Sequence, residues 1–299
     1  MFKKILYPTD FSDVSKKALD YIKQLKAGGV EKVIVLHVID QRVFYAIESY
    51  STDNTARLEM EIKEGVEKEL KSLREALERA GLVVETMVKT GIPVREILRI
   101  EKEGDVSVIV IGSHGKSNLE EMFMGSVSEK VARKCEKPIL IIKREIDQEK
   151  GSNMYNRILF PTDFSDVSQK ALAYIKQLKA CGSKEVVVLH IIDQSGLYTL
   201  DRHAADAGVF ERWEKREKEQ TAQSLMGIEK ELKECDFKVK TLIKIGIPLR
   251  EILKTEEGEE TSIVVIGSHG KTNLEEIFLG SVSEKVLKRC KNPVLLVKR

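Results

Sequence analysis

Residues 5–15 read Ile-Leu-Tyr-Pro-Thr-Asp-Phe-Ser-Asp-Val-Ser, and residues 158–168 read Ile-Leu-Phe-Pro-Thr-Asp-Phe-Ser-Asp-Val-Ser. The two stretches lie 153 residues apart, counted from Pro8 to Pro161. A second landmark, Gly-Ser-His-Gly-Lys, starts at Gly112 and again at Gly267, 155 residues later. A repeat this long is typical of two whole domains and not of a solenoid of short units.

The chain length agrees with two domains, since 299 residues is twice the roughly 150 that one domain usually takes. We predict domains over residues 1–144 and 157–299, joined by a polar linker over residues 145–156. The offset between the copies grows from 153 to 155 residues between the two landmarks, so the second copy has two additional residues there. We place them in the dissimilar stretch that follows Asp40 and Asp193.

Within each copy, short apolar strands alternate with amphipathic helices. The first copy has a helical stripe from Val14 to Leu25, a longer one from Leu58 to Leu77, and shorter helices after Pro93 and Gly125. Five β-branched runs are too apolar to have a solvent face, as in a parallel sheet covered on both sides: 4–7, 33–39, 83–88, 106–111 and 139–142. We predict an α/β protein with two tandem, open, doubly wound five-stranded parallel sheets and helices on both faces.

The composition limits the cellular context. Hydrophobic residues make up 42% and charged residues 33%, and 50 Lys and Arg nearly balance 48 Asp and Glu. This balance gives no reason to propose a nucleic-acid partner. No apolar run is long enough for an export signal or a membrane span. The four cysteines lack C-x-x-C spacing, which favours reduced thiols in the cytoplasm and no protein-bound metal.

The carboxyl ends of strands one and four are the expected ligand site, because open α/β sheets bind ligands there. Strand one ends in Pro8-Thr9-Asp10, and strand four leads into Gly112 and Gly115, with Gly125-Ser126 after nine further residues. Gly112 and Gly115 would allow positive φ and a close approach of the backbone to a bulky anion.

The residues from Ser126 to Glu129 match a capping box, as do those from Ser281 to Glu284. The backbone N–H groups of Val127 and Ser128 would then form an anion site at a helix N-terminus. The Ser126 hydroxyl could accept the capping bond and still donate its proton to a phosphate oxygen.

Two standard nucleotide loops are excluded. A P-loop ending at Gly115-Lys116-Ser117 would need glycine at position 110, where Val110 stands, and the second copy has Val265. The G-x-G-x-x-G pattern is missing after strand one. Catalysis by His114 or His269 lacks support, since Ser113 would point away from its neighbour, and Lys116 and Lys271 are expected to be solvated. We therefore expect no catalytic residue.

The Pro-Thr-Asp-Phe-Ser start, combined with Gly-x-x-Gly, nine residues and Gly-Ser, resembles the ATP-binding branch of the universal stress protein family. The resemblance covers nearly the whole chain, twice. It implies strand order 3-2-1-4-5 and an adenine nucleotide, ATP or AMP, between strands one and four. It also implies that Asp10 holds the nucleoside and that residues 37–39 meet the adenine edge with backbone groups.

Together, the strand ends and the resemblance predict one nucleotide site in each copy. In the first copy the site residues are Pro8, Thr9, Asp10, His37, Val38, Ile39, Ile111, Gly112, His114, Gly115, Gly125, Ser126, Val127 and Ser128. In the second copy they are Pro161, Thr162, Asp163, His190, Ile191, Ile192, Ile266, Gly267, His269, Gly270, Gly280, Ser281, Val282 and Ser283. The side chains of His37 and His190 are expected to pack at strand ends, and the unmatched stretch from Tyr198 to Phe210 would cover or open the second cleft.

These features predict a cytoplasmic tandem universal stress protein that binds adenine nucleotide and acts as a sensor or regulator in a stress response. A single carboxylate is a poor metal site, so Mg²⁺ would arrive only with the phosphates of ATP. No base for an attacking water and no arginine finger are evident, which predicts no enzyme activity beyond slow ATP hydrolysis. The alternatives are a nucleotide hydrolase or nucleotidyl transferase, and an interaction module independent of nucleotide.

The last strand of each copy predicts how the chain assembles. Residues 138–144 and 293–299 contain apolar strands that the family order places at a sheet edge, and an open apolar edge invites pairing. In single-copy relatives this edge forms the dimer, as the resemblance implies. We expect the two copies to form an intrachain pseudo-dimer through it, with room for a further homodimer.

Overall fold

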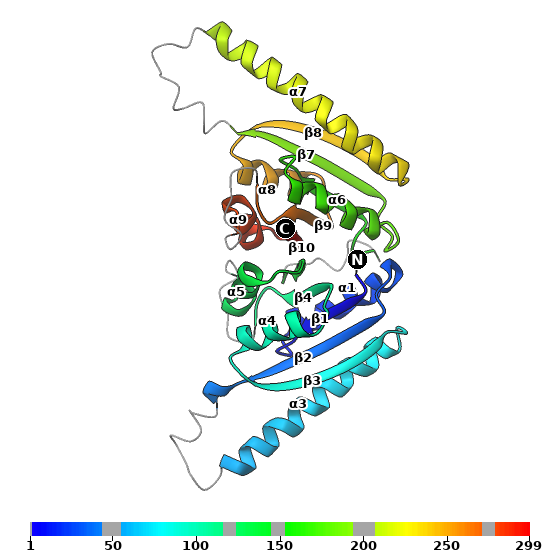
Figure 1. The fold of residues 1–299 in the computed structure, drawn as a ribbon, viewed down its shortest axis with the longest axis vertical. Coiled ribbons are helices and arrows are strands. Elements are labelled where there is room, and N and C mark those ends of the chain that lie inside the picture. Colours follow the sequence, from blue (N-terminus) through cyan, green and yellow to red (C-terminus); the bar gives the residue numbers. More distant parts are fainter. Residues whose placement is uncertain (1, 44–54, 116–123, 145–152, 194–206, 271–278) are drawn as a thin grey trace. The chain divides into compact units, whose positions relative to one another are not determined.

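The computed structural model describes residues 2–43, 55–115, 124–144, 153–193, 207–270 and 279–299. It divides into two compact units, Met1–Glu145 and Ile146–Arg299 (Figure 1). None of the helices in the described ranges combines the length and apolar character needed to cross a bilayer.

The first unit is a parallel sheet with strand order β3-β2-β1-β4-β5, which confirms the predicted α/β fold and the order 3-2-1-4-5. Its helices lie on both faces: α1 contacts α3, and α4 contacts α5. The elements are β1 (Lys4–Pro8), α1 (Asp13–Leu25), the 3-10 helix η1 (Lys26–Gly28), β2 (Lys32–Asp40), α3 (Thr55–Glu78), β3 (Val83–Gly91), α4 (Pro93–Glu103), β4 (Val108–Gly112), α5 (Ser126–Lys134) and β5 (Ile139–Ile142).

The second unit repeats this topology, and its strand order, written from the matching edge, is β8-β7-β6-β9-β10. Its elements are β6 (Arg157–Pro161), α6 (Asp166–Leu178), β7 (Glu185–Asp193), α7 (Ala207–Glu234), β8 (Lys238–Gly246), α8 (Pro248–Gly258), β9 (Ile263–Gly267), α9 (Ser281–Arg289) and β10 (Val294–Val297). The described end of the linker packs against this unit, since Tyr155 is fully buried and its carbonyl accepts a hydrogen bond from Ser183 Oγ at 2.6 Å.

The central strands are buried on both faces, as their sequences require. Every residue of β4 and β9 is buried, and Ile5, Leu6 and Tyr7 of β1 have no exposed surface. Each crossover from one parallel strand to the next carries a helix whose apolar stripe covers the sheet. The helix α1 ends where η1 leads to Gly29, whose φ of 96° favours glycine.

Two strand limits differ from the sequence prediction by more than one residue. β4 begins at Val108 and not at Val106, because Ser107 is bound to the start of β1: its Oγ accepts from Lys4 N and donates to Lys4 O, both at 2.8 Å. β3 continues past Val88 to Gly91, because its backbone stays paired with β2 as far as Asp40.

Candidate functional site

The turn after β1 is held by a buried network of hydroxyl groups. Thr9 Oγ1 accepts hydrogen bonds from Phe11 N at 3.0 Å and from Ser15 Oγ at 2.8 Å. The Tyr7 hydroxyl donates to Ser15 O at 2.7 Å, and burial raises the pKa of Tyr7. These bonds hold Phe11 at a φ of 62°, which is costly for a residue other than glycine. The hydrogen bonds therefore hold the turn in a strained backbone conformation, as is common at functional sites.

Asp10 is the half-buried carboxylate that this turn presents. Its Oδ1 accepts a hydrogen bond from Ser12 N at 3.1 Å, so the side chain is tied to its own turn. A methyl group built on Gly115 would lie 2.6 Å from Asp10 Oδ2. A side chain at position 115 would therefore force the Asp10 carboxylate to shift.

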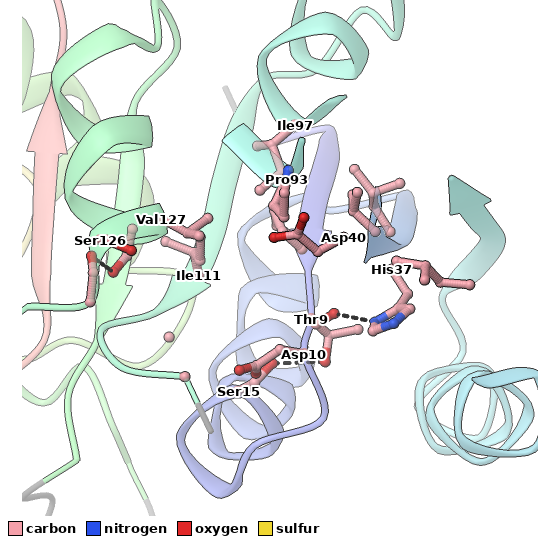
Figure 2. A pocket seen from close by; sticks show the side chains of 18 of the residues that line it. Thr9, Asp10, Ser15, His37, Asp40, Pro93, Ile97, Ile111, Ser126 and Val127 are labelled. Atoms are coloured by element: carbon pink, nitrogen blue, oxygen red, sulfur yellow. Dashed lines mark hydrogen bonds between the residues drawn. The ribbon is translucent and has the colours of Figure 1, made fainter. Parts of the chain in front are cut away.

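The side chain of His37 packs at the end of β2, as predicted. Its Nδ1 lies 2.8 Å from Thr9 O, and its ring stacks on Phe11 with centroids 4.5 Å apart (Figure 2). Backbone atoms of residues 37–39 thereby stay beside the turn after β1.

The loop after β4 is joined to the start of α5 through Ser113. Its carbonyl oxygen accepts hydrogen bonds from Gly125 N at 2.7 Å and from Ser128 Oγ at 2.8 Å, and its own N–H donates to Ile142 O at 2.7 Å. Ser113 is fully buried. These bonds fix the N-terminus of α5 beside the ends of β4 and β5.

The predicted capping box is wrong. The residue before α5 is Gly125, with extended backbone (φ −61°, ψ 147°), and Ser126 is already the first helical residue. Gly125 has no side chain that could cap the first turn of α5, and Ser126 is exposed. The helix α9 begins in the same way after Gly280. A helix that begins without a capping side chain has first-turn N–H groups that can donate to an anion.

The positive φ expected at Gly112 and Gly115 is not found, and Gly125 lacks it as well. At Gly112 and Gly125, space is the reason for glycine. A Cβ on Gly112 would lie 3.1 Å from Ser15 N, and one on Gly125 would lie 3.2 Å from Ser113 O. The glycines let α1 and α5 approach the end of β4 closely.

Ser113 and His114 were expected to point apart, and they do not. Ser113 Oγ lies 2.8 Å from His114 Nδ1, and Ser268 Oγ lies 2.8 Å from His269 Nδ1. The pair makes no nucleophile, since both serines are fully buried. Burial, helped by Lys298 and Arg299, lowers the pKa of His269, so this ring is neutral at pH 7.

All fourteen residues predicted for the first copy line one cavity of about 620 Å³ at the carboxyl ends of the strands. Figure 2 shows Ser126 and Val127 on one side of it, with Thr9, Asp10 and His37 on the other. No lysine or arginine is among the described lining residues. Sequence reasoning missed seven further lining residues: Ser15, Leu36, Asp40, Val43, Ile62, Pro93 and Ile97.

The cavity has two chemically different ends. The N-terminus of α5 and the loop after β4 supply N–H groups and hydroxyls, while Ile62, Pro93 and Ile97 supply apolar surface from α3 and α4. Beside the apolar end, Asp40 is paired with Arg42, and that hydrogen-bonded pairing lowers the pKa of the Asp40 carboxyl. A ligand with an anionic end and a flat apolar end fits this arrangement.

The second unit repeats most of these contacts. Phe164 has a φ of 61° and stacks on His190, with ring centroids 4.6 Å apart, and His190 Nδ1 lies 2.8 Å from Thr162 O. A methyl group on Gly270 would lie 2.7 Å from Asp163 Oδ2. Pro161, Ile191, Ile192 and Ile266 lie on the matching strands, and Gly267 ends β9. At the start of α9, Gly280 N donates to Ser268 O at 2.8 Å and Ser283 Oγ donates to Gly267 O at 2.7 Å, beside Ser281 and Val282 in the first turn.

Some of the sequence predictions lie outside the described residues. They are Lys116, Lys271 and the part of the unmatched stretch from Tyr198 to Asp206.

Comparison with known proteins identifies the fold family. The model of the universal stress protein family matches residues 1–143 and again residues 154–298. Universal stress protein MJ0577 of Methanocaldococcus jannaschii is 44% identical over 158 residues, which cover 50% of this chain and 98% of that protein. Universal stress protein Slr1230 of Synechocystis sp. is 26% identical over 314 residues, which cover 98% of this chain and 99% of that protein.

A solved structure agrees over the full length. The crystal structure of a universal stress protein from Archaeoglobus fulgidus has a TM-score of 0.71 and 27% sequence identity, and the match covers 100% of this chain and 99% of that one. The chain therefore belongs to the universal stress protein family, as the motifs indicated, and carries two tandem copies of the family's domain.

Proposed function

We propose that this protein binds an adenine nucleotide, ATP or AMP, in each of its two copies and works as a cytoplasmic sensor or regulator in a stress response. The observation that carries the proposal is the first cavity, in which an uncapped helix N-terminus, close-packed glycines and an apolar end face one ligand-sized space. None of the four cysteines, all within the described residues, forms a disulfide bond, which supports a reducing compartment.

The phosphates would lie at the N-terminus of α5. The first-turn N–H groups and the exposed Ser126 hydroxyl are hydrogen-bond donors, and the helix dipole favours negative charge there. The nucleoside would reach toward Asp10 and the backbone of β2, with the base against the apolar end. Asp10 Oδ1 accepts a hydrogen bond from Ser12 N, and the several lone pairs of a carboxylate allow it to accept from a ribose hydroxyl as well.

Binding, and not turnover, is what these residues are suited to. The carboxylates that line the first cavity are Asp10, held in its turn, and Asp40, paired with Arg42, and neither is arranged to activate a water. Mg²⁺ would come with ATP, because phosphate oxygens must complete its ligand shell. An assay of phosphate release from ATP should therefore give a slow rate or none. Rapid turnover would favour the hydrolase alternative.

The first test is the stoichiometry of binding. Both copies keep the aspartate, the glycines and the uncapped helix, so chain stripped of nucleotide should bind two ATP molecules per polypeptide in titration calorimetry. The mass of the ligand released from freshly purified protein should be that of ATP or AMP. Saturation at one equivalent would limit the proposal to one copy, and no binding at all would favour an interaction module.

A second prediction concerns the last strands. β5 and β10 each stand at the end of their own unit's strand order, and each consists of four apolar residues. We propose that they pair, giving an intrachain pseudo-dimer. The backbone amides of Ile141 and Leu296 that face away from their own sheets should then exchange with deuterium as slowly as those of β1. Fast exchange there, with slow exchange in β1, would contradict the pairing.

A further inference from the structure

One lining position of the cavity differs in character between the two copies. Of the 21 lining residues, Val43 falls where the copies cannot be matched, and eighteen of the rest are identical at the matching position. Val38 is replaced by Ile191, which preserves the chemistry. The remaining position is Ile62 in the first copy and Glu217 in the second.

The match between Ile62 and Glu217 is fixed by the register of the two long helices. The buried residues of α3 and α7 pair one to one at a spacing of 155 residues, with the same degree of burial. The pairs are Val66 and Thr221 (8% and 6% exposed), Leu70 and Leu225 (4% and 3%), Leu73 and Ile228 (4% and 3%), and Leu77 and Leu232 (both 0%). Glu217 therefore takes the place of Ile62, one turn before this stripe.

The two side chains differ in chemistry at this helix position. Ile62 is half-buried and lines the cavity with Pro93 and Ile97. Glu217 is also half-buried, and no hydrogen bond or ion pair joins it to any residue in the described ranges, although its neighbour Lys218 pairs with Glu214. A ligand base placed there would lose an apolar wall and would take water from an unpaired carboxylate.

We propose that the residue at this helix position sets the relative affinity of the two sites, with the Ile62 site binding adenine nucleotide more tightly than the Glu217 site. The proposal rests on the proposed function and adds its unequal sites. Because the contact is with the base, the difference holds for adenosine as well as for ATP. We expect about a tenfold difference in Kd, equivalent to about 1.4 kcal/mol.

The test is a reciprocal substitution in the full chain, followed by calorimetry with ATP and with adenosine. Wild type should give a two-phase isotherm, Glu217→Ile should merge it into one phase of two equal tight sites, and Ile62→Glu should give two weak sites. Glu219→Ile is the matched control, since Glu219 is an exposed residue two positions along the same helix. It should leave both phases unchanged.

The outcomes separate this inference from the proposed function. No heat at either site would remove the function itself. Two equal sites in wild type, or two phases that persist in Glu217→Ile, would overturn the role of this position. A second site that is tighter in wild type and weaker in Glu217→Ile would mean that the carboxylate binds a donor on the base, which also overturns the proposal.

Discussion

Replacing Gly125 and Gly280 together by valine is expected to abolish measurable ATP binding while the fold is kept. The backbone of Gly125 (φ −61°, ψ 147°) suits any residue, so the effect is steric. A Cβ there would lie 3.2 Å from Ser113 O and 3.5 Å from Ser128 Oγ, and the branches of valine need still more room. The start of α5 must then move away from the loop after β4.

This movement would misplace the N–H groups assigned to the phosphates. A hydrogen bond to a charged group contributes roughly 1.5–3 kcal/mol, so each one lost should weaken binding about tenfold to a hundredfold. Alanine at the same two positions would require neighbouring atoms to shift by only a few tenths of an ångström. The double alanine variant should therefore bind ATP with an affinity between those of wild type and the valine variant.

The control for this prediction lies in the long helices. Gly65 and Gly227 have no atom within 4 Å of a built Cβ, so Gly65→Val with Gly227→Val should leave binding intact. Calorimetry measures binding, and circular dichroism checks that each variant is folded. If the Gly125 and Gly280 double variant is folded and binds ATP as tightly as wild type, the phosphate assignment must be abandoned.

The fold could be predicted because the same apolar runs occur twice and their burial is nearly complete. Runs such as 139–142 leave no polar face, so a sheet covered on both sides was the one arrangement that fitted them. The first and last residues of the strands were harder to predict from the sequence. The start of β4 depends on the Ser107 hydroxyl, and the end of β3 on backbone pairing with β2, and neither is a matter of hydrophobicity.

The candidate site was predictable where it consists of strand ends and glycines. Ser15, Pro93 and Ile97 were missed because they belong to helices, whose approach to the cavity depends on packing and not on a motif. Ser15 could have been suspected from its repetition at Ser168, since a polar residue on the buried side of a helix needs a partner.

Local conformation explains the remaining errors. The S-x-x-E pattern at Ser126 fits a capping box, yet the extended backbone of Gly125 moves the helix start by one residue. The contact of Ser113 with His114 likewise depends on how the chain leaves β4. Sequence patterns give the residue types at such turns, but the backbone angles that decide their contacts come from packing around them.

The second large effect is expected at the other end of the site. Asp10→Ala with Asp163→Ala should weaken the binding of ATP and of adenosine alike, by about tenfold to a hundredfold at each site. This is the loss in affinity expected when one hydrogen bond to a charged group is removed. Figure 2 shows Asp10 across the cavity from Ser126 and Val127, so its loss should leave the phosphate contacts in place.

Two variants distinguish ligand binding from a local change in the turn. Asp10→Asn with Asp163→Asn keeps an oxygen that can accept from the N–H of Ser12 and of Ser165, so it preserves the turn while removing the charge. Asp13→Ala with Asp166→Ala removes an exposed carboxylate three residues further along and should leave both affinities unchanged.

The ratio of ATP to adenosine affinity then tells the two ends of the site apart. The glycine variant should lose its preference for ATP over adenosine, because its defect lies with the phosphates, and the aspartate variant should keep the preference of wild type at lower overall affinity. If Asp10→Ala with Asp163→Ala lowered ATP affinity but left adenosine binding intact, the carboxylate would act at the phosphates, through the Mg²⁺ that ATP carries. The nucleoside would then have to be reassigned to the opposite end of the cavity, against the α5 N-terminus.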